Sequence, residues 1–147
     1  MRRLALCFLL FALAANCVAR EETVAELKAR LESARPEDRP EICVQIARLE
    51  LRAADKLYGE GHVDEARADV EDVATYFEKA RDAAIESKKH LKNVEINGRK
   101  TSEKLRDMKR TLAFEDQAPV EKAIRQIEDV RTALLNEMFS EKKKGRK

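Results

Sequence analysis

The sequence is poor in the residues that enzyme active sites and nucleic-acid interfaces most often use. It contains no tryptophan, two histidines and four glycines, and aromatic residues make up 5% of the chain. Neither histidine belongs to a zinc-binding His-Glu-x-x-His pattern, no glycine-rich phosphate loop is present, and no serine stands in a nucleophile elbow. These absences predict a protein that is not an enzyme and that uses no cofactor or metal.

Cysteine is also scarce. Two of the three cysteines, Cys7 and Cys17, fall within the first nineteen residues, which leaves Cys43 alone. A single cysteine forms no internal disulfide, so the fold must rely on packing. We expect Cys43 to be a small core residue, because it lies three residues before Ile46 near an apolar stripe. An intermolecular disulfide through Cys43, joining two copies into a homo-oligomer, stays open as the alternative.

The one long apolar run lies at the N-terminus. Arg2 and Arg3 precede an uninterrupted apolar stretch over residues 4–15, and small residues follow at 17–19. This is the layout of a secretory signal peptide, and the run is shorter than the roughly twenty residues that span a bilayer. We therefore expect residues 1–19 to be cleaved and the mature protein to be exported, to a periplasm or to the secreted space.

Cys17 offers a second route of export, as the acylated cysteine of a lipoprotein. Asn16 precedes it, where that pathway prefers a glycine, alanine or serine. The sequence therefore favours ordinary cleavage after Ala19 over lipidation.

Charge is abundant but balanced. Removing Arg2 and Arg3 from the 30 basic residues leaves 28, which equals the number of acidic residues, so the mature chain is formally neutral. The charges are unevenly distributed, because residues 60–78 are mostly acidic, residues 79–110 are mostly basic, and residues 142–147 include no acid. Such blocks orient a protein against a charged partner without making it a general binder of polyanions.

Hydrophobic periodicity predicts an all-α fold, a small helical bundle of about five helices. Thr23 and Glu26 form a capping-box pattern for a first helix over about 23–34. Asp38 is a candidate cap for a second helix that residues 59–61 close.

The strongest pattern lies in the middle of the chain. Apolar positions alternate by three and four residues from Val63 to Val94, and no glycine or proline interrupts residues 63–97. This predicts one unusually long helix over about 63–97 in coiled-coil-like packing against other helices. We expect Asn97 and Gly98 to end it in a left-handed turn. The alternative, a tight hairpin at this pair, would have no sheet to join.

Two more helices complete the expected bundle. One covers about 101–114, and the last follows a candidate cap at Asp116. Its inner face is expected to carry Val120, Ile124, Ile127, Leu134 and Met138. The expected organisation is therefore a signal peptide over 1–19, a single helical domain over 20–140 and a basic disordered tail over 141–147.

One segment of about 30 residues resembles a single tetratricopeptide repeat. The residues that carry the resemblance are Ala54, Leu57, Gly61, Ala66, Val70 and Val73. Leu57 stands where that family prefers an aromatic residue, and no second unit recurs, although arrays of at least three are usual. The resemblance implies an antiparallel helical hairpin and gives one functional alternative, a periplasmic chaperone or adaptor.

Basic residues on both sides of the Asn97-Gly98 pair and at the C-terminus are candidates for contact with an anionic surface. These are Lys88, Lys89, Lys92, Arg99, Lys100, Lys104, Lys142, Lys143, Lys144, Arg146 and Lys147. The shortage of aromatic residues and the expected export argue against nucleic acid. Anionic lipid or an envelope polymer is the better match, since each lysine near an anionic membrane contributes about 1 kcal/mol.

The sequence as a whole thus predicts an exported, non-enzymatic helical protein. Its expected role is structural, or the binding of protein partners, in the cell envelope or the secreted space.

Overall fold

The computed structural model describes residues 22–145 of the chain. The signal peptide expected over 1–19, the acylation alternative at Cys17, and the two tail residues Arg146 and Lys147 lie outside the described residues. Within them, no helix combines the length and the apolar composition needed to cross a membrane.

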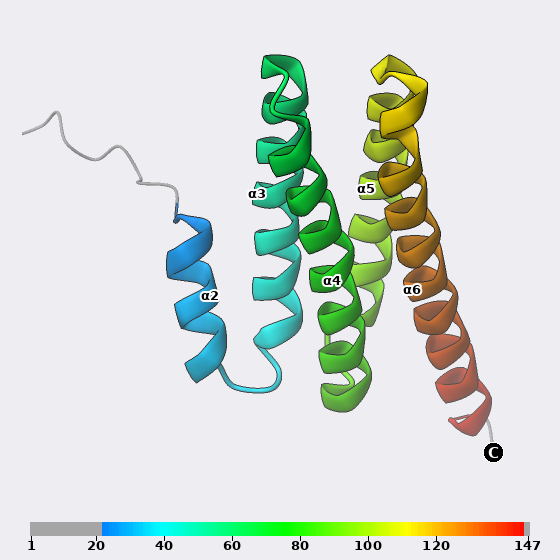
Figure 1. Cartoon of the computed structure of the whole chain (residues 1–147). Coiled ribbons are helices and arrows are strands. Elements are labelled where there is room, and N and C mark those ends of the chain that lie inside the picture. Colours follow the sequence, from blue (N-terminus) through cyan, green and yellow to red (C-terminus); the bar gives the residue numbers. More distant parts are fainter. Residues whose placement is uncertain (1–21, 146–147) are drawn as a thin grey trace, which may run out of the picture.

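The described chain is all-helical, as expected. Its elements in chain order are α2 (Val24–Ser33), α3 (Arg39–Glu60), α4 (Val63–Ser87), α5 (Leu91–Thr111), the short 3₁₀ helix η1 (Phe114–Asp116) and α6 (Gln117–Lys144). Figure 1 shows α3 and α4 as one antiparallel pair and α5 and α6 as another, with α4 beside α6 and α2 against the outer side of α3. The molecule is therefore a small helical bundle.

Two helix ends follow directly from local sequence. The backbone N–H of Thr23 donates to Glu26 Oε2 at 2.8 Å, and the N–H of Glu26 donates back to Thr23 Oγ1 at 3.2 Å, which confirms the capping box. Gly61 ends α3 with a left-handed backbone, φ 82°. Because glycine has no Cβ, this conformation causes no steric clash, and the chain turns directly into α4.

The prediction of one long helix over 63–97 is wrong, because the helix is interrupted between Ser87 and Leu91. Lys88 and His90 both adopt left-handed backbone conformations, φ 57° and 61°. The break is supported locally, since Ser87 Oγ accepts the N–H of Lys89 at 3.3 Å. The apolar stripe nevertheless resumes in register at Leu91 and Val94, which are both buried. Periodicity alone therefore could not distinguish one long helix from two packed helices.

The turn expected at Asn97 and Gly98 is also wrong, because both residues lie inside α5. The Asn97 amide donates to the backbone oxygen of Asn93 at 2.8 Å, and its oxygen accepts Arg48 Nη2 of α3 at 2.5 Å. The side chain that favours a left-handed stop is thus used instead to join two helices. The helix expected over about 101–114 is the second half of α5.

Helix α6 has the inner face that the sequence predicts. Val120, Ile124, Ile127 and Leu134 are buried, and Met138 is partly buried against the core. The helix does not end at Ser140, however, but continues to Lys144.

The prediction of a disordered tail is therefore wrong for residues 141–144. The ammonium of Lys88 pairs with the carboxylates of Glu137 and Glu141, which holds the last turns of α6 against the end of α4. Sequence periodicity missed this support because the pairing joins residues about fifty positions apart.

The two aspartates expected to cap helices are the residues that precede them, but neither side chain makes a capping hydrogen bond. The Asp38 carboxylate accepts Arg35 Nε at 3.0 Å. The Asp116 carboxylate accepts Arg67 Nη2 of α4 at 2.6 Å, which ties the start of α6 to the start of α4. Ion pairing with arginine has replaced capping at both positions.

The core is centred on α4. Phe77 is fully buried, and the alanines at 80 and 84 are also fully buried along the same helix. Small side chains at these positions let neighbouring helices approach closely, while Ile46 from α3 and Leu134 from α6 fill the space around them. Helices α3 and α5 contact each other far less than either contacts its antiparallel partner. The coiled-coil-like geometry expected for this packing stays a prediction.

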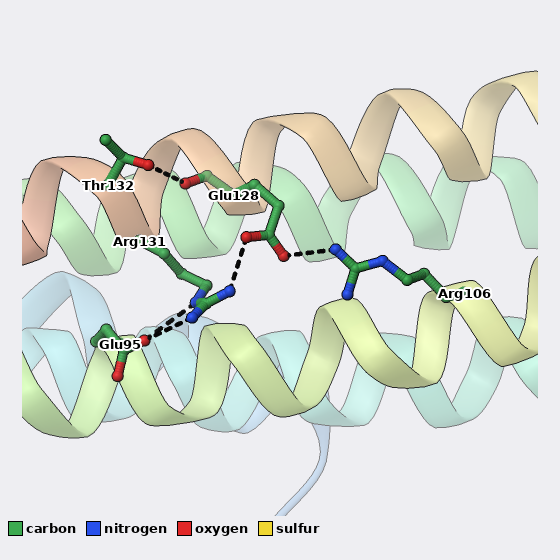
Figure 2. Close-up of polar contacts among 5 residues, drawn as sticks. All are labelled: Glu95, Arg106, Glu128, Arg131 and Thr132. Carbon is green, nitrogen blue, oxygen red and sulfur yellow. Dashed lines mark hydrogen bonds and ion pairs between the residues drawn. The ribbon is translucent and has the colours of Figure 1, made fainter.

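An ion-pair network joins α5 to α6 (Figure 2). Arg131 donates to Glu95 Oε1 through Nε at 3.1 Å and through Nη2 at 2.9 Å, and Nη1 donates to Glu128 at 2.7 Å. Arg106 donates to the other oxygen of Glu128 at 2.9 Å. The guanidinium of Arg131 is therefore fixed from two sides, one on each helix.

Gly98 makes room for this arginine. A Cβ built at Gly98 would lie 3.0 Å from Arg131 Cγ and 3.6 Å from Ile127 Cγ2. The arginine stem cannot withdraw without stretching its bonds to Glu95 and Glu128. The glycine is thus required by close packing, although its position inside a helix is unfavourable in itself.

We predict that Gly98→Ala fails to give the stabilisation of about 0.5–1 kcal/mol that replacing a helical glycine by alanine usually brings. The control is Gly59→Ala in α3, where a Cβ would meet nothing within 4 Å and the usual gain is expected. In an Arg131→Ala background, Gly98→Ala should recover the gain. Urea unfolding of these variants measures each difference, and equal gains at both glycines in the native background would contradict the steric role of Arg131.

Helix α2 buries Leu27 in the core, and Lys28 adds polar contacts to two other helices. Lys28 Nζ lies 3.2 Å from a carboxylate oxygen of Glu50 on α3 and 3.2 Å from one of Asp72 on α4, and it sits 5.3 Å from the centre of the Tyr76 ring. Glu50 is buried, and burial raises its pKa while the hydrogen bond from Lys28 opposes the rise. A buried carboxylate is tolerated here because a cation reaches it from α2.

The raised pKa of Glu50 fixes the direction of a pH effect. The folded state holds this proton more tightly than the unfolded chain, so the group favours folding at low pH, and this contribution is lost as pH rises through the raised pKa. Above that pH the buried Glu50 carboxylate is ionised, and the ammonium of Lys28 stabilises its charge.

We therefore predict that Lys28→Met lowers the free energy of unfolding by about 1–3 kcal/mol at neutral pH, less than for a fully buried pair because Lys28 is partly exposed. The loss should be much smaller near pH 4, about where a free glutamate takes up its proton. In a Glu50→Gln background the same change should cost little at either pH. Denaturant unfolding at the two pH values tests this, and an equal loss at both would refute the dependence on Glu50.

Candidate partner-binding groove and basic end

A groove opens where α3 and α5 diverge. It consists of two adjoining hollows of about 390 and 370 Å³ that share Leu51, Arg52 and Lys104. We call this surface the α3–α5 groove. Its cationic half is lined by Arg48, Leu51, Arg52, Asn97, Lys100, Thr101 and Lys104. Its mixed half adds Asp55, Asp107, Met108 and Thr111.

The cationic half carries four basic side chains and no acidic one. Arg48 is oriented by its hydrogen bond to Asn97, which is buried in the floor. Lys100 and Lys104 are exposed and form no ion pair with any other residue in the described part of the chain. An anionic group entering here would meet mobile cations at the rim and a polar floor.

Three other cations of α5 differ from these two lysines because they are paired with acids. Further along the same helix, Arg106 pairs with Glu128, Lys109 lies 3.5 Å from a carboxylate oxygen of Glu121, and Arg110 pairs with its neighbour Asp107. These cations are already matched by acids of the bundle, whereas the cations on the groove side of α5 remain available to a partner.

The basic residues singled out from the sequence separate into two surfaces. Lys100 and Lys104 line the α3–α5 groove, whereas Lys88, Lys89, Lys92, Lys142 and Lys143 gather where α4 ends, α5 begins and α6 ends. We call this second surface the basic end. Arg99 is exposed on α5 outside the groove lining, and Lys144 belongs to the last turn of α6.

Sequence reasoning missed Arg48 and Arg52, which supply half of the positive charge in the groove. The two residues are four positions apart, so a helical projection places them on one face of α3. That signal is weak, since such pairs are common on helix surfaces. Their importance appears only once α5 lies beside them.

At the basic end, Lys88 differs from the other lysines because it has a structural partner. Its hydrogen bond to Glu137, and secondly the charges of Glu137 and Glu141, raise the pKa of its ammonium. Lys88 therefore offsets one of the two negative charges in the last turns of α6. Lys89 and Lys92 are exposed near the turn and form no ion pair with any described residue.

Cys43 occupies the position that the core interpretation predicts. It is 2% exposed, and burial raises the pKa of its thiol to about 11. A thiol in this state is mostly protonated at neutral pH and reacts slowly. The intermolecular disulfide would require the chain around Cys43 to open first, so the burial disfavours that alternative.

The two histidines have ordinary surroundings. His62 Nδ1 lies 3.4 Å from a carboxylate oxygen of Glu65 at the start of α4, and His90 is exposed in the turn before α5. Over residues 22–145, no three histidine, cysteine, aspartate or glutamate side chains come together in a way that would hold a metal ion.

The residues that resemble a tetratricopeptide repeat lie in the α3–α4 hairpin, where Ala54, Ala66, Val70 and Val73 are all fully buried. Comparisons of the chain with protein-family models, with curated proteins and with solved structures found no match. The two charged surfaces are therefore the features of this chain that point to a function.

Proposed function

We propose that this chain is an exported, non-enzymatic helical protein that binds an acidic segment of a partner protein in the α3–α5 groove. The observation that carries the proposal is the set of four cations, Arg48, Arg52, Lys100 and Lys104, around one hollow with no acid among its lining residues. In a chain with balanced charge, such a local excess provides a complementary surface for an acidic partner.

The shape of the groove favours a polypeptide segment over a single small anion. The cationic half continues into the mixed half, where Met108 and Thr111 lie beside Asp55 and Asp107. A segment that crosses both halves can place carboxylates on the lysines and apolar or basic side chains further along. Hydrogen bonds to charged groups contribute about 1.5–3 kcal/mol where they are partly shielded from water.

The alternative role as a general chaperone receives less support. Binding of unfolded clients uses exposed apolar surface. The large apolar side chains that are exposed in the described part of the chain are Phe114 and Phe139. Phe114 lies just before the start of α6, and Phe139 lies near its end. A charged groove without exposed aromatic residues suits a defined acidic partner better.

We predict that the protein binds a fluorescein-labelled peptide of ten glutamates and that Lys100→Glu/Lys104→Glu weakens this binding at least tenfold. The matched control is Lys142→Glu/Lys143→Glu, which makes the same change in charge at the basic end and should leave the affinity within about twofold. Fluorescence anisotropy at moderate ionic strength measures both affinities. No binding by the native chain, or equal losses in the two variants, would overturn the assignment to the groove.

Export makes a separate prediction. If residues 1–19 act as a cleaved signal peptide, the protein recovered from its host should begin at Arg20. Mass spectrometry of the intact protein reads this directly. A chain that keeps Met1 would contradict export by cleavage, and a lipid-modified chain that begins at Cys17 would select the lipoprotein route.

A further inference from the structure

Two aromatic rings are exposed at opposite ends of the molecule. Phe114 is 88% exposed in η1, where Glu115 and Asp116 follow it, and Phe139 is 62% exposed in the last turns of α6. A single exposed phenylalanine is common on protein surfaces, so only its surroundings can indicate what it contacts. Phe114 is followed directly by two acids, whereas Phe139 lies between Glu137 and Glu141 and is followed by lysines at 142–144.

The helix places Phe139 on the same side as the C-terminal lysines. Lys142 and Lys143 follow it by three and four positions, which in an α-helix brings them next to the ring, and both are exposed. Leu135, one turn earlier, is partly exposed on the same side. This end of α6 therefore combines an aromatic ring and a flanking pair of cations on one face.

A second group of cations reaches the same end from the turn between α4 and α5. Figure 1 shows the end of α4 and the end of α6 at the same end of the bundle, and Lys88 pairs with Glu137 and Glu141 across them. Lys89 in this turn and Lys92 in the first turn of α5 are both exposed. The five lysines of the basic end outnumber Glu137 and Glu141, so this end of the molecule carries a net positive charge.

We propose that the basic end, with Phe139 at its centre, docks the protein on the surface of an anionic lipid bilayer. The lysines match the negative headgroups, and the ring inserts at the boundary between headgroups and acyl chains. An acidic polymer or protein would offer this surface charge alone, whereas an exposed ring beside the lysines matches a partner with an apolar layer under its charged groups. The contact is peripheral, and it is independent of the α3–α5 groove.

The absence of tryptophan from the chain gives a direct test. Phe139→Trp and Phe114→Trp each introduce a single fluorescent reporter at one of the two exposed positions. The chain that begins at Arg20 is suitable, because it keeps every helix from α2 to α6.

With vesicles of equal parts phosphatidylglycerol and phosphatidylcholine, Trp fluorescence at position 139 should shift to the blue. The reporter at position 114 should stay unchanged, and vesicles of phosphatidylcholine alone should shift neither. High salt should reverse the shift, because the attraction is electrostatic.

Charge reversal at the basic end distinguishes vesicle binding by that surface from peptide binding in the α3–α5 groove. Lys142→Glu/Lys143→Glu should weaken vesicle binding at least tenfold. The matched change Lys100→Glu/Lys104→Glu should leave it within about twofold, which makes failure of the groove and failure of the basic end distinguishable.

Any of four results would overturn the proposal. The first is an equal shift with neutral vesicles, and the second is an equal shift at both reporter positions. The third is vesicle binding that survives Lys142→Glu/Lys143→Glu unchanged. Binding of a soluble polyanion such as polyphosphate, with no response of the position-139 reporter to anionic vesicles, would likewise reject the bilayer as the partner.

Discussion

The position of α5 depends on two adjacent residues that contact different helices. Asn97 accepts a hydrogen bond from Arg48 of α3, and Gly98 lets the stem of Arg131 from α6 cross the helix backbone closely. An isolated helix would gain from other residues at both positions, since asparagine and glycine are poor helix formers. Their cost is offset by contacts that fix how far α5 stands from each neighbour. That spacing leaves the α3–α5 groove open while the opposite side of α5 is closed by the ion pairs of Arg131.

The features that could be predicted from the sequence are those decided by neighbouring residues. The capping box of Thr23 and Glu26 needs only a span of three residues, and the left-handed end at Gly61 needs only the absence of a side chain. The break after Ser87 has no such marker, because the residues with left-handed backbone there are a lysine and a histidine. The apolar stripe continues across the break, so the same pattern describes one helix or two. Only tertiary contacts, such as the pairing of Lys88 with α6, distinguish the two structures.

The two charged surfaces could not be predicted from neighbouring residues either. From the sequence, the lysines before and after Asn97 belong to one basic segment, because they are close along the chain. In the fold, Lys92 and Lys104 lie on different surfaces, since three helical turns separate them along α5. Conversely, Arg52 of α3 joins Lys104 in one groove although about fifty residues separate them. Distance along the chain therefore groups charges poorly in a bundle of long helices, where partners are set by helix pairing.

Pairing also explains why the remaining unpaired charges are informative. Lys28 attaches α2 through Glu50, Arg67 ties α4 to Asp116, and Arg131 joins α5 to α6. These bridges use charges where they hold helices together. A lysine without such a partner contributes little to folding, and an exposed charge by itself is consistent with solubility alone. The lysines of the groove and of the basic end differ because each group lies beside a second feature, a hollow with a polar floor in one case and an exposed aromatic ring in the other. Solubility requires neither, whereas binding an acidic segment uses the hollow and contact with a bilayer uses the ring.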